Sequence, residues 1–212
     1  RRGKASERQR QLSGIVLQKA LRDAVRLRLI PHNPCTEVEK PRPEKREMRV
    51  WDEEQVGKFL TAAAEDRLYG LYVLALASGL REGELFGLEW TDVDFENGAI
   101  TVRRTTEEIS GAIRVKEPKT TRSRRRVDLP DNVVSALHDH RKRMFAEGHA
   151  AGPVFCDQRG GYLRVSNVRR RSFRPLIERA GVPVIRFHDL RHTNTSLLLL
   201  QGVHPKVVSE RL

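Results

Sequence analysis

The segment from Leu68 to Ala77 constrains the fold more than any other part of this sequence, because it is apolar almost all round. A helix of that kind cannot lie on a surface and has to be surrounded by other elements. It is too short to cross a bilayer, which takes about 20 apolar residues, and the apolar run Leu197 to Leu200 is shorter still. We therefore expect a central buried helix that ends at Ser78-Gly79, with a globular domain packed around it.

Apolar residues at helical spacing predict the elements that surround this helix. Asp52 is followed three residues later by Gln55, which resembles a capping box and marks a helix start. The face of that helix expected to be buried consists of Val56, Phe59, Leu60 and Ala63. Further helices are expected at 81–88, 131–145, 166–180 with Gly181 as its C-cap, 188–200 and 205–212.

Between these helices the spacing of apolar residues changes to two, which is typical of strands. One hairpin is predicted around Asn97-Gly98, and a second around a loop that contains Pro118. The alternating residues are Val93, Phe95, Ile100 and Val102 in the first hairpin and Ile113, Val115, Val127 and Leu129 in the second. The expected fold class is therefore mainly α with a small three-stranded antiparallel sheet (α+β).

The chain divides at a charged segment, Lys40 to Glu47, in which two prolines interrupt the backbone and nothing apolar is available for burial. One long amphipathic helix is expected before it, over 6–30, ended by Pro31 and Pro34. A single helix cannot form a domain by itself. We therefore interpret residues 1–36 as the end of a helical domain whose other helices lie upstream, 37–50 as a linker, and 51–212 as the main domain.

The charge balance indicates the partner. Lys and Arg number 40 against 28 Asp and Glu, which gives a formal net charge of +12 and favours a polyanion. Only 6% of the residues are aromatic, which argues against a surface that stacks single-stranded bases and favours phosphate contacts to duplex DNA.

Cys35 and Cys156 lie far apart, and no Cys or His stands at ligand spacing from either. Neither a disulfide nor a metal site is predicted, and two reduced thiols in a cytoplasmic protein are the expected state. No membrane span is expected. We also expect no signal peptide, because the chain opens Arg-Arg-Gly-Lys without an apolar run behind it.

Two arginines open predicted helices, where the positive end of the helix dipole favours an anion. Arg81 follows Ser78-Gly79-Leu80, and Arg191 lies three residues after His188, on the same face of a first helical turn. The plain alternative for each arginine is a solvated surface charge, but both lie next to strongly apolar segments, where a charge needs an anionic partner. Glu84 could be that partner for Arg81. His192 lies about 100° round the helix from Arg191, so we expect it to support the site by packing.

A basic loop lies at the tip of the predicted second hairpin. Arg122, Arg124 and Arg125 are expected to contact phosphates there. Lys119 could do more, because a lysine on a turn can donate a proton to a leaving group, which an arginine does not readily do.

Three of these segments together resemble the catalytic boxes of the tyrosine recombinase (phage integrase) family. Ser78-Gly-Leu-Arg-Glu-Gly-Glu-Leu85 is similar to the first arginine box, Pro118-Lys-Thr with the following Ser123-Arg-Arg to the hairpin lysine, and His188-Asp-Leu-Arg-His-Thr193 to the His-x-x-Arg box. Their order and spacing also agree with the family. The resemblance covers roughly 44–212, and the N-terminal helix resembles the last helix of the family's core-binding domain.

The resemblance implies the catalytic-domain fold of that family and a site-specific recombinase that cleaves and rejoins DNA through a 3′-phosphotyrosine. Arg81 and Arg191 would hold the two non-bridging phosphate oxygens, Lys119 would protonate the leaving 5′ oxygen, and His188 would act as acid or base. Glu84 and His192 would support the site. No cofactor, ATP or metal is implied, and the implied partners are double-stranded DNA and other recombinase protomers in a synaptic complex, in a bacterial or phage-encoded system.

The nucleophile is where the sequence departs from the family. In the family the tyrosine follows a Leu-Gly-His or similar box, which comes after a segment like Val-Ser-Glu-Arg-Leu, and here that segment ends at Leu212. We expect the nucleophile to lie beyond this position, so that the main domain is incomplete at its C-terminal end and the fragment is inactive. For Tyr69, Tyr72 and Tyr162 we expect core packing instead.

Two other interpretations remain open. A type IB topoisomerase uses a similar set of residues only to relax supercoils. The other is a non-catalytic helix-turn-helix DNA-binding protein. The expected helical segments 195–200 and 205–212, separated by a turn at 201–203, have the outline of that motif. Under this last interpretation Arg81 and Lys119 are dispensable.

Overall fold

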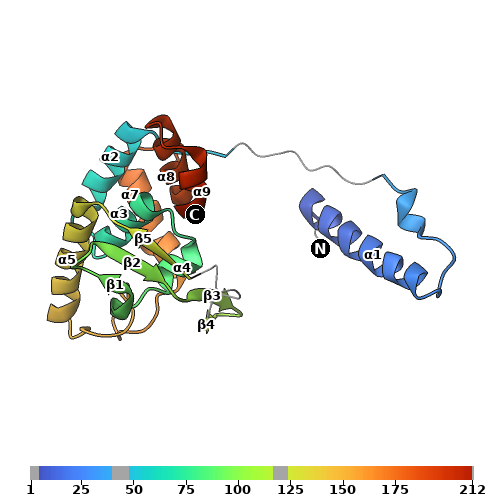
Figure 1. Cartoon of the computed structure of the whole chain (residues 1–212), viewed down its shortest axis with the longest axis horizontal. Helices are drawn as coiled ribbons and strands as arrows, with labels where there is room; N and C mark the ends of the chain where they lie inside the picture. Colours follow the sequence, from blue (N-terminus) through green and yellow to red (C-terminus); the bar gives the residue numbers. More distant parts are fainter. Residues whose placement is uncertain (1–4, 40–47, 117–123, 212) are drawn as a thin grey trace. The chain divides into compact units, whose positions relative to one another are not determined.

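The computed structural model describes residues 5–39, 48–116 and 124–211 (Figure 1). The chain forms two compact units, Arg1–Met48 and Arg49–Leu212. The division falls inside the segment 37–50 that the sequence analysis interprets as a linker, so each unit is described by itself.

The first unit is built on one helix, α1 (Glu7–Arg26), which begins with a capping box between Ser6 and Gln9. The helix is shorter than the predicted 6–30, because Arg28 takes a left-handed conformation with φ of 58° before Pro31 is reached. A short 3-10 turn, η1 (Pro34–Thr36), follows. None of the residues of α1 is buried, and the exposed side chains include Leu12, Ile15, Val16 and Leu17.

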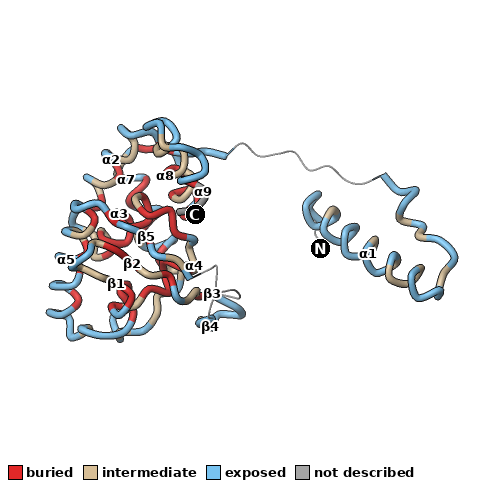
Figure 2. The backbone as a smooth tube through the Cα atoms, viewed as in Figure 1, coloured by how far each residue is buried: buried red, intermediate tan, exposed pale blue. Residues whose placement is uncertain are grey.

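The second unit is organised around α3 (Tyr69–Ser78), as the sequence predicts. Eight of its ten residues are buried, and Figure 2 shows the helix at the centre of the unit. Gly79 ends it in the left-handed conformation, with φ of 62°, a position that glycine adopts without steric cost. Three further helices pack against it: α2 (Glu53–Ala63), α5 (Asp131–Ala146) and α8 (Asp189–Leu200).

Aromatic rings fill the space between α2, α3 and the later helices. Phe59 lies at the centre of this cluster, with ring centroids 4.8 Å from Trp51, 5.2 Å from Tyr72 and 5.6 Å from Phe173. Phe187 extends it at 5.3 Å from Phe173. Edge-to-face and tilted pairs at these distances add to the stabilisation from burial.

The predicted helix over 166–180 contains a π-helical turn. It consists of α6 (Val165–Val168), the turn η4 (Arg169–Phe173) and α7 (Arg174–Ala180), with Gly181 as its left-handed C-cap. In a π turn the hydrogen bonds join residues five apart, so Val168 and Phe173 face the core together and both are buried. A regular helix would turn one of them outward.

The three-stranded antiparallel sheet is present, with the order β1 (Val93–Asp94), β2 (Ala99–Val102), β5 (Arg125–Asp128). The predicted second hairpin is wrong. β4 (Ala112–Lys116) pairs with β3 (Thr105–Ile109), while β5 pairs with β2 so that Val127 lies opposite Ile100 in the core. Ser110-Gly111 supplies the two positive φ angles of a tight hairpin turn, a signal that the sequence analysis did not use.

Three short elements complete the unit: α4 (Glu82–Phe86), the 3-10 turn η2 (Trp90–Asp92) and α9 (Pro205–Arg211), which contacts α8. Among the described residues, no helix is both long and apolar enough to span a membrane.

We predict that Phe59→Ala destabilises the second unit by about 3–5 kcal/mol, because it removes a fully buried ring from the aromatic cluster. The matched control is Phe145→Ala on α5, where the ring is 70% exposed, with an expected change within about 0.5 kcal/mol. Urea unfolding of both variants measures the difference. Equal losses would show that the cluster is not the centre of the core.

Candidate active site

The candidate site is built around one carboxylate, that of Glu84 on α4. Arg81, the N-cap residue of α4, donates its backbone N–H to Glu84 Oε2 (2.9 Å) and its guanidinium Nη1 to Oε1 (3.0 Å). The Arg81 side chain is 57% exposed whereas that of Glu84 is 8% exposed. Glu84 is thus the internal partner that the sequence analysis considered for Arg81. Glu84 also accepts from the backbone N–H of Arg81 at the start of the helix. The guanidinium is therefore the exposed donor of Arg81.

Arg125 is the second partner of the same carboxylate. Its Nη1 donates to Glu84 Oε1 (3.0 Å) and its Nη2 to Oε2 (2.8 Å). We expected Arg125 in an exposed loop, but the structure places it in β5 with its side chain 14% exposed. The missed signal is the strand period of two, which puts Arg125 on the same face as the buried Val127.

Opposing effects act on Glu84. Burial by itself raises the pKa of the Glu84 carboxyl group. Hydrogen bonds from the Arg125 side chain and from the backbone and side chain of Arg81, together with the charge of Arg125, outweigh burial and lower the pKa below its ordinary value. The carboxylate is therefore ionised at neutral pH. It balances one of the two guanidinium charges that it binds.

Arg191, the third residue of α8, adds another positive charge. Its Nη1 donates to the carbonyl oxygen of Gly79 at 2.6 Å, just past the end of α3. Burial lowers the pKa of Arg191, and the nearby charges of Arg81 and Arg125 lower it further against the opposing effect of Glu84. Arg81, Arg125 and Arg191 therefore form one group around Glu84, called the arginine cluster below.

His188 lies beside this cluster. It precedes α8 and, with Arg191 and Glu82, lines a small cavity. Burial lowers its pKa, and so do the adjacent His192 and Arg191, whereas Glu82 and Asp189 act in the opposite direction. The imidazole rings of His188 and His192 meet edge to face, with centroids 5.2 Å apart, so the two side chains are in contact.

Two residues of α8 that the sequence analysis did not single out fix this helix in place. Asn194 donates to the carbonyl oxygens of Leu76 (2.7 Å) and Ala77 (3.1 Å) at the end of α3. Thr193 accepts from the backbone N–H of Trp51 at 3.2 Å. Both are buried. The signal available in the sequence was the presence of two polar side chains in a helix expected to pack against the core.

Of the other predicted residues, Arg124 is exposed and directly precedes β5. Lys119 and Arg122 lie outside the described residues. No group of three His, Cys, Asp or Glu side chains arranged to hold a metal ion occurs in the part of the chain that the structure describes.

The three tyrosines have other partners or neighbours. The Tyr72 hydroxyl shares a hydrogen bond of 2.6 Å with Ser172, and burial raises its pKa. Tyr162 donates to Glu89 Oε1 at 2.5 Å, and burial raises its pKa to about 12. Tyr69 packs against the core. A phenol that is buried or hydrogen-bonded to a carboxylate in this way is a poor nucleophile at neutral pH.

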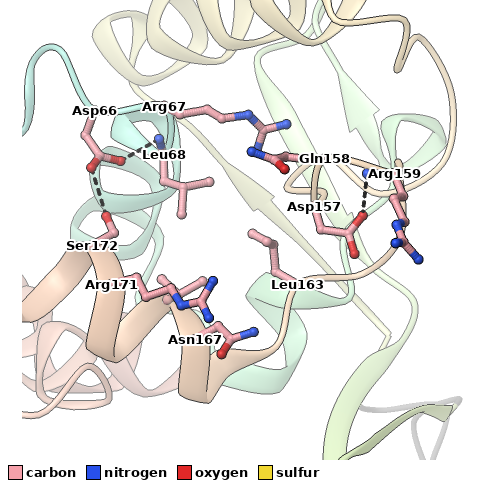
Figure 3. A pocket seen from close by; sticks show the side chains of 11 residues that line it. Asp66, Arg67, Leu68, Asp157, Gln158, Arg159, Leu163, Asn167, Arg171 and Ser172 are labelled. Atoms are coloured by element: carbon pink, nitrogen blue, oxygen red, sulfur yellow. Dashed lines mark hydrogen bonds between the residues drawn. The ribbon is translucent and has the colours of Figure 1, made fainter.

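A wider hollow, of about 570 Å³, lies between the start of α3 and η4 (Figure 3). Its carboxylates serve the fold: Asp66 accepts from the Leu68 N–H (2.8 Å) and from Ser172 (2.9 Å), and Asp157 accepts from the Arg159 N–H (2.9 Å). None of the predicted site residues that the structure describes lines it. We therefore place the candidate site at the arginine cluster, where charged groups with shifted pKa values converge.

Comparison with known proteins gives a family and a fold. The model of the phage integrase family matches residues 49–212. The tyrosine recombinase XerC-like protein of Caldanaerobacter subterraneus subsp. tengcongensis is 35% identical over 205 residues, which is 85% of this chain and 52% of that protein. The ICEBs1 integrase of Bacillus subtilis is 28% identical over 204 residues, 92% of this chain and 55% of that one.

Among solved structures, the Tn1549 transposon integrase in complex with transposon right end DNA matches with a TM-score of 0.82 at 21% identity, covering 98% of this chain and 71% of that one. This likeness shows the fold, the catalytic-domain fold expected from the sequence. The chain spans about half the length of the two curated relatives named above.

We predict that Glu84→Gln lowers the free energy of unfolding by about 3 kcal/mol, because it removes the carboxylate charge that binds the mostly buried guanidinium of Arg125. The control is Glu178→Gln, which breaks the exposed ion pair between Arg174 and Glu178 and should cost less than about 0.5 kcal/mol. Urea unfolding at neutral pH compares the two. A loss for Glu84→Gln no larger than that of the control would rule out a structural role for the shared carboxylate.

Proposed function

The chain belongs to the phage integrase family, and from this we propose that it is the catalytic part of a tyrosine-type site-specific DNA recombinase. The observation that carries the proposal is the arginine cluster: Arg81 and Arg191 come from distant parts of the sequence and meet around Glu84, with His188 beside them. Such a group suits a phosphodiester, whose two non-bridging oxygens accept from guanidinium donors.

In the proposed reaction a tyrosine oxygen attacks a DNA phosphorus atom, and the bond from phosphorus to the 5′ oxygen breaks. The tyrosine hydroxyl gives up its proton as the 3′-phosphotyrosyl link forms, and the leaving 5′ oxygen takes up a proton to become a 5′-hydroxyl. A 5′-hydroxyl of another strand then attacks the link and releases the tyrosine, so the number of phosphodiester bonds is conserved and no energy source is needed.

The site residues have separate roles in this reaction. Arg81 and Arg191 bind the non-bridging oxygens and stabilise the negative charge of the transition state. The exposed guanidinium of Arg81 is held by the buried Glu84, so little reorganisation is required when the phosphate arrives. His188 exchanges a proton with the phosphate or the nucleophile, and His192 supports its ring.

Arg125 has a different role from the one the sequence suggested. Because both of its terminal nitrogens bind Glu84, we propose that it positions Glu84 and thereby Arg81. Lys119 protonates the leaving 5′ oxygen, and Arg122 and Arg124 bind neighbouring phosphates. For Lys119 and Arg122 these roles rest on the resemblance to the family.

The proposed nucleophile is none of Tyr69, Tyr72 and Tyr162. The hydroxyls of Tyr72 and Tyr162 are committed to Ser172 and Glu89. We propose double-stranded DNA and further recombinase protomers as partners, and the bacterial cytoplasm as the place of action. Residues 1–36 are proposed to belong to a DNA-clamping helical domain, since Leu12, Ile15, Val16 and Leu17 of α1 are exposed in the described part of the unit.

A helix-turn-helix protein without catalysis is the second candidate, because α8 and α9 are joined by a short turn. It does not account for three guanidinium groups gathered around one buried carboxylate. An assay of strand cleavage by the complete protein distinguishes a catalytic from a non-catalytic function. Sequencing of the joined products then distinguishes recombination, which joins different strands, from topoisomerase activity, which rejoins the same strand.

We predict that Arg191→Ala in the complete protein reduces strand cleavage by at least about 100-fold while DNA binding changes little, because its contact strengthens mainly in the transition state. Arg174→Ala, at an exposed position paired with Glu178, serves as the control and should cleave normally. Cleavage of a nicked duplex and binding of the same duplex are measured side by side. Normal cleavage by Arg191→Ala would exclude the proposed site.

We further predict that Lys119→Ala loses cleavage of ordinary DNA but cleaves a substrate whose 5′ leaving group is a thiol. A thiolate leaves without protonation, so the loss of the proton donor no longer matters. Arg191→Ala should remain inactive on the thiol substrate, because its role is charge stabilisation. Equal defects of Lys119→Ala on both substrates would show that Lys119 is not the proton donor.

A further inference from the structure

Glu82 is an acidic residue in a place that is proposed to receive a phosphate. It lies next to Arg81 at the start of α4, with its side chain 20% exposed, and lines the same small cavity as His188 and Arg191. A bare carboxylate there would repel a phosphodiester. Its presence therefore needs an explanation that the proposed reaction does not give.

Arg169 binds this carboxylate from the other side. Its Nη2 donates to both carboxylate oxygens, at 2.7 and 2.6 Å, and its Nε to one of them at 3.1 Å. Arg169 is the first residue of the π turn η4. The side chain of Arg169 is 50% exposed, so the carboxylate lies between a guanidinium open to solvent on one side and the His188 cavity on the other.

The charged groups around His188 come from three elements. His192, Arg191 and Asp189 lie on α8 itself, Glu82 lies on α4, and Arg169 on η4 reaches the cavity only through Glu82. The remaining residues that line the cavity are apolar: Ala75, Leu80, Leu85, Phe187 and Leu190. Glu82 is therefore the carboxylate that lines the cavity together with His188.

A plainer account is that Glu82 only stabilises the start of α4 and ties it to η4. An acid in the first turn does favour a helix, and the ion pair does join the two elements. That account does not explain why the carboxylate lines the same cavity as His188. It predicts that substitution of Arg169 or Glu82 changes stability alone.

We propose that Glu82 is a positioning residue for His188 in the cavity that they share, and that Arg169, which binds both oxygens of Glu82, limits the action of Glu82 on His188 and cancels the repulsion between Glu82 and the phosphate. The inference rests on the proposed function, since it takes His188 to be a residue of the active site. The direct consequence is that Arg169 acts on His188 only through Glu82.

The pKa of His188 in the purified chain tests this directly. It is measured from the pH dependence of the imidazole carbon-bound proton in NMR spectra, with the signal assigned by its loss in His188→Gln. We expect a lower pKa in Glu82→Gln, because a negative charge is removed, and a higher pKa in Arg169→Met, because Glu82 is no longer shared. The double variant should match Glu82→Gln, and Arg169→Lys should restore the wild-type value.

Arg174→Met is the matched control, since it removes an arginine of the following helix that is paired with Glu178, and it should leave the pKa of His188 unchanged. An unchanged pKa in Glu82→Gln, or an equal shift from Arg169→Met with and without Glu82, overturns the proposal. If Glu82→Gln does not fold, Arg169→Met and Arg169→Lys decide: the first has to raise the pKa and the second has to leave it unchanged.

A second readout separates this inference from the proposed function. In the complete protein, Arg169→Met should shift the limb of the cleavage pH profile that depends on His188 toward higher pH. Absence of cleavage by the wild-type protein would overturn the proposed function, whereas the NMR result would still decide the relation between Glu82, Arg169 and His188.

Discussion

The carboxylate of Glu84 is the contact on which the site depends. It is mostly buried, and it binds Arg81 at the start of α4 and Arg125 on β5, so it joins a helix to a sheet. A buried carboxylate is stable only when its charge is compensated and its oxygens are hydrogen-bonded. Both oxygens of Glu84 are satisfied by arginines. The same bonds that make the acid tolerable in the core therefore fix a guanidinium at the surface.

The end of α3 holds the guanidinium of Arg191 in place, as Glu84 holds that of Arg81. The left-handed Gly79 ends the helix, and its carbonyl oxygen accepts from the Arg191 guanidinium. Asn194, one turn further along α8, uses the preceding carbonyl oxygens of α3 in the same way. These last carbonyls of a helix have no partner within the helix. They are satisfied by α8, and this requirement holds the His188 and Arg191 segment against the Arg81 segment.

Patterns within single elements could be read from the sequence. The buried helix α3 with its glycine stop, the Asp52 and Gln55 capping box and the first hairpin follow from local spacing, and the structure has all three. The strand that pairs with β4 could not be identified from the sequence, because several short polar strands are possible partners. The pairing depends on tertiary packing: β5 pairs with β2, which places Val127 opposite Ile100, and β4 pairs with β3. The π turn was missed for a similar reason, since only packing requires Val168 and Phe173 on one face. Arg125 was placed in a loop because its carboxylate partner is distant in sequence.

Like charges lie close together in the arginine cluster. Burial lowers the pKa of Arg191, and the charges of Arg81 and Arg125 lower it further. A guanidinium nevertheless remains protonated at neutral pH, so repulsion between like charges, which accounts for part of this shift, persists in the folded protein. Glu84 offsets part of it, and the Gly79 carbonyl contributes a dipole rather than a charge. Repulsion of this kind disfavours the folded state but is relieved by any anion placed between the guanidinium groups. In the proposed reaction the pentavalent phosphate carries more charge on its oxygens than the ground state does, so it would relieve more of the repulsion. The unfavourable charge distribution of the free site thus becomes preferential stabilisation of the transition state.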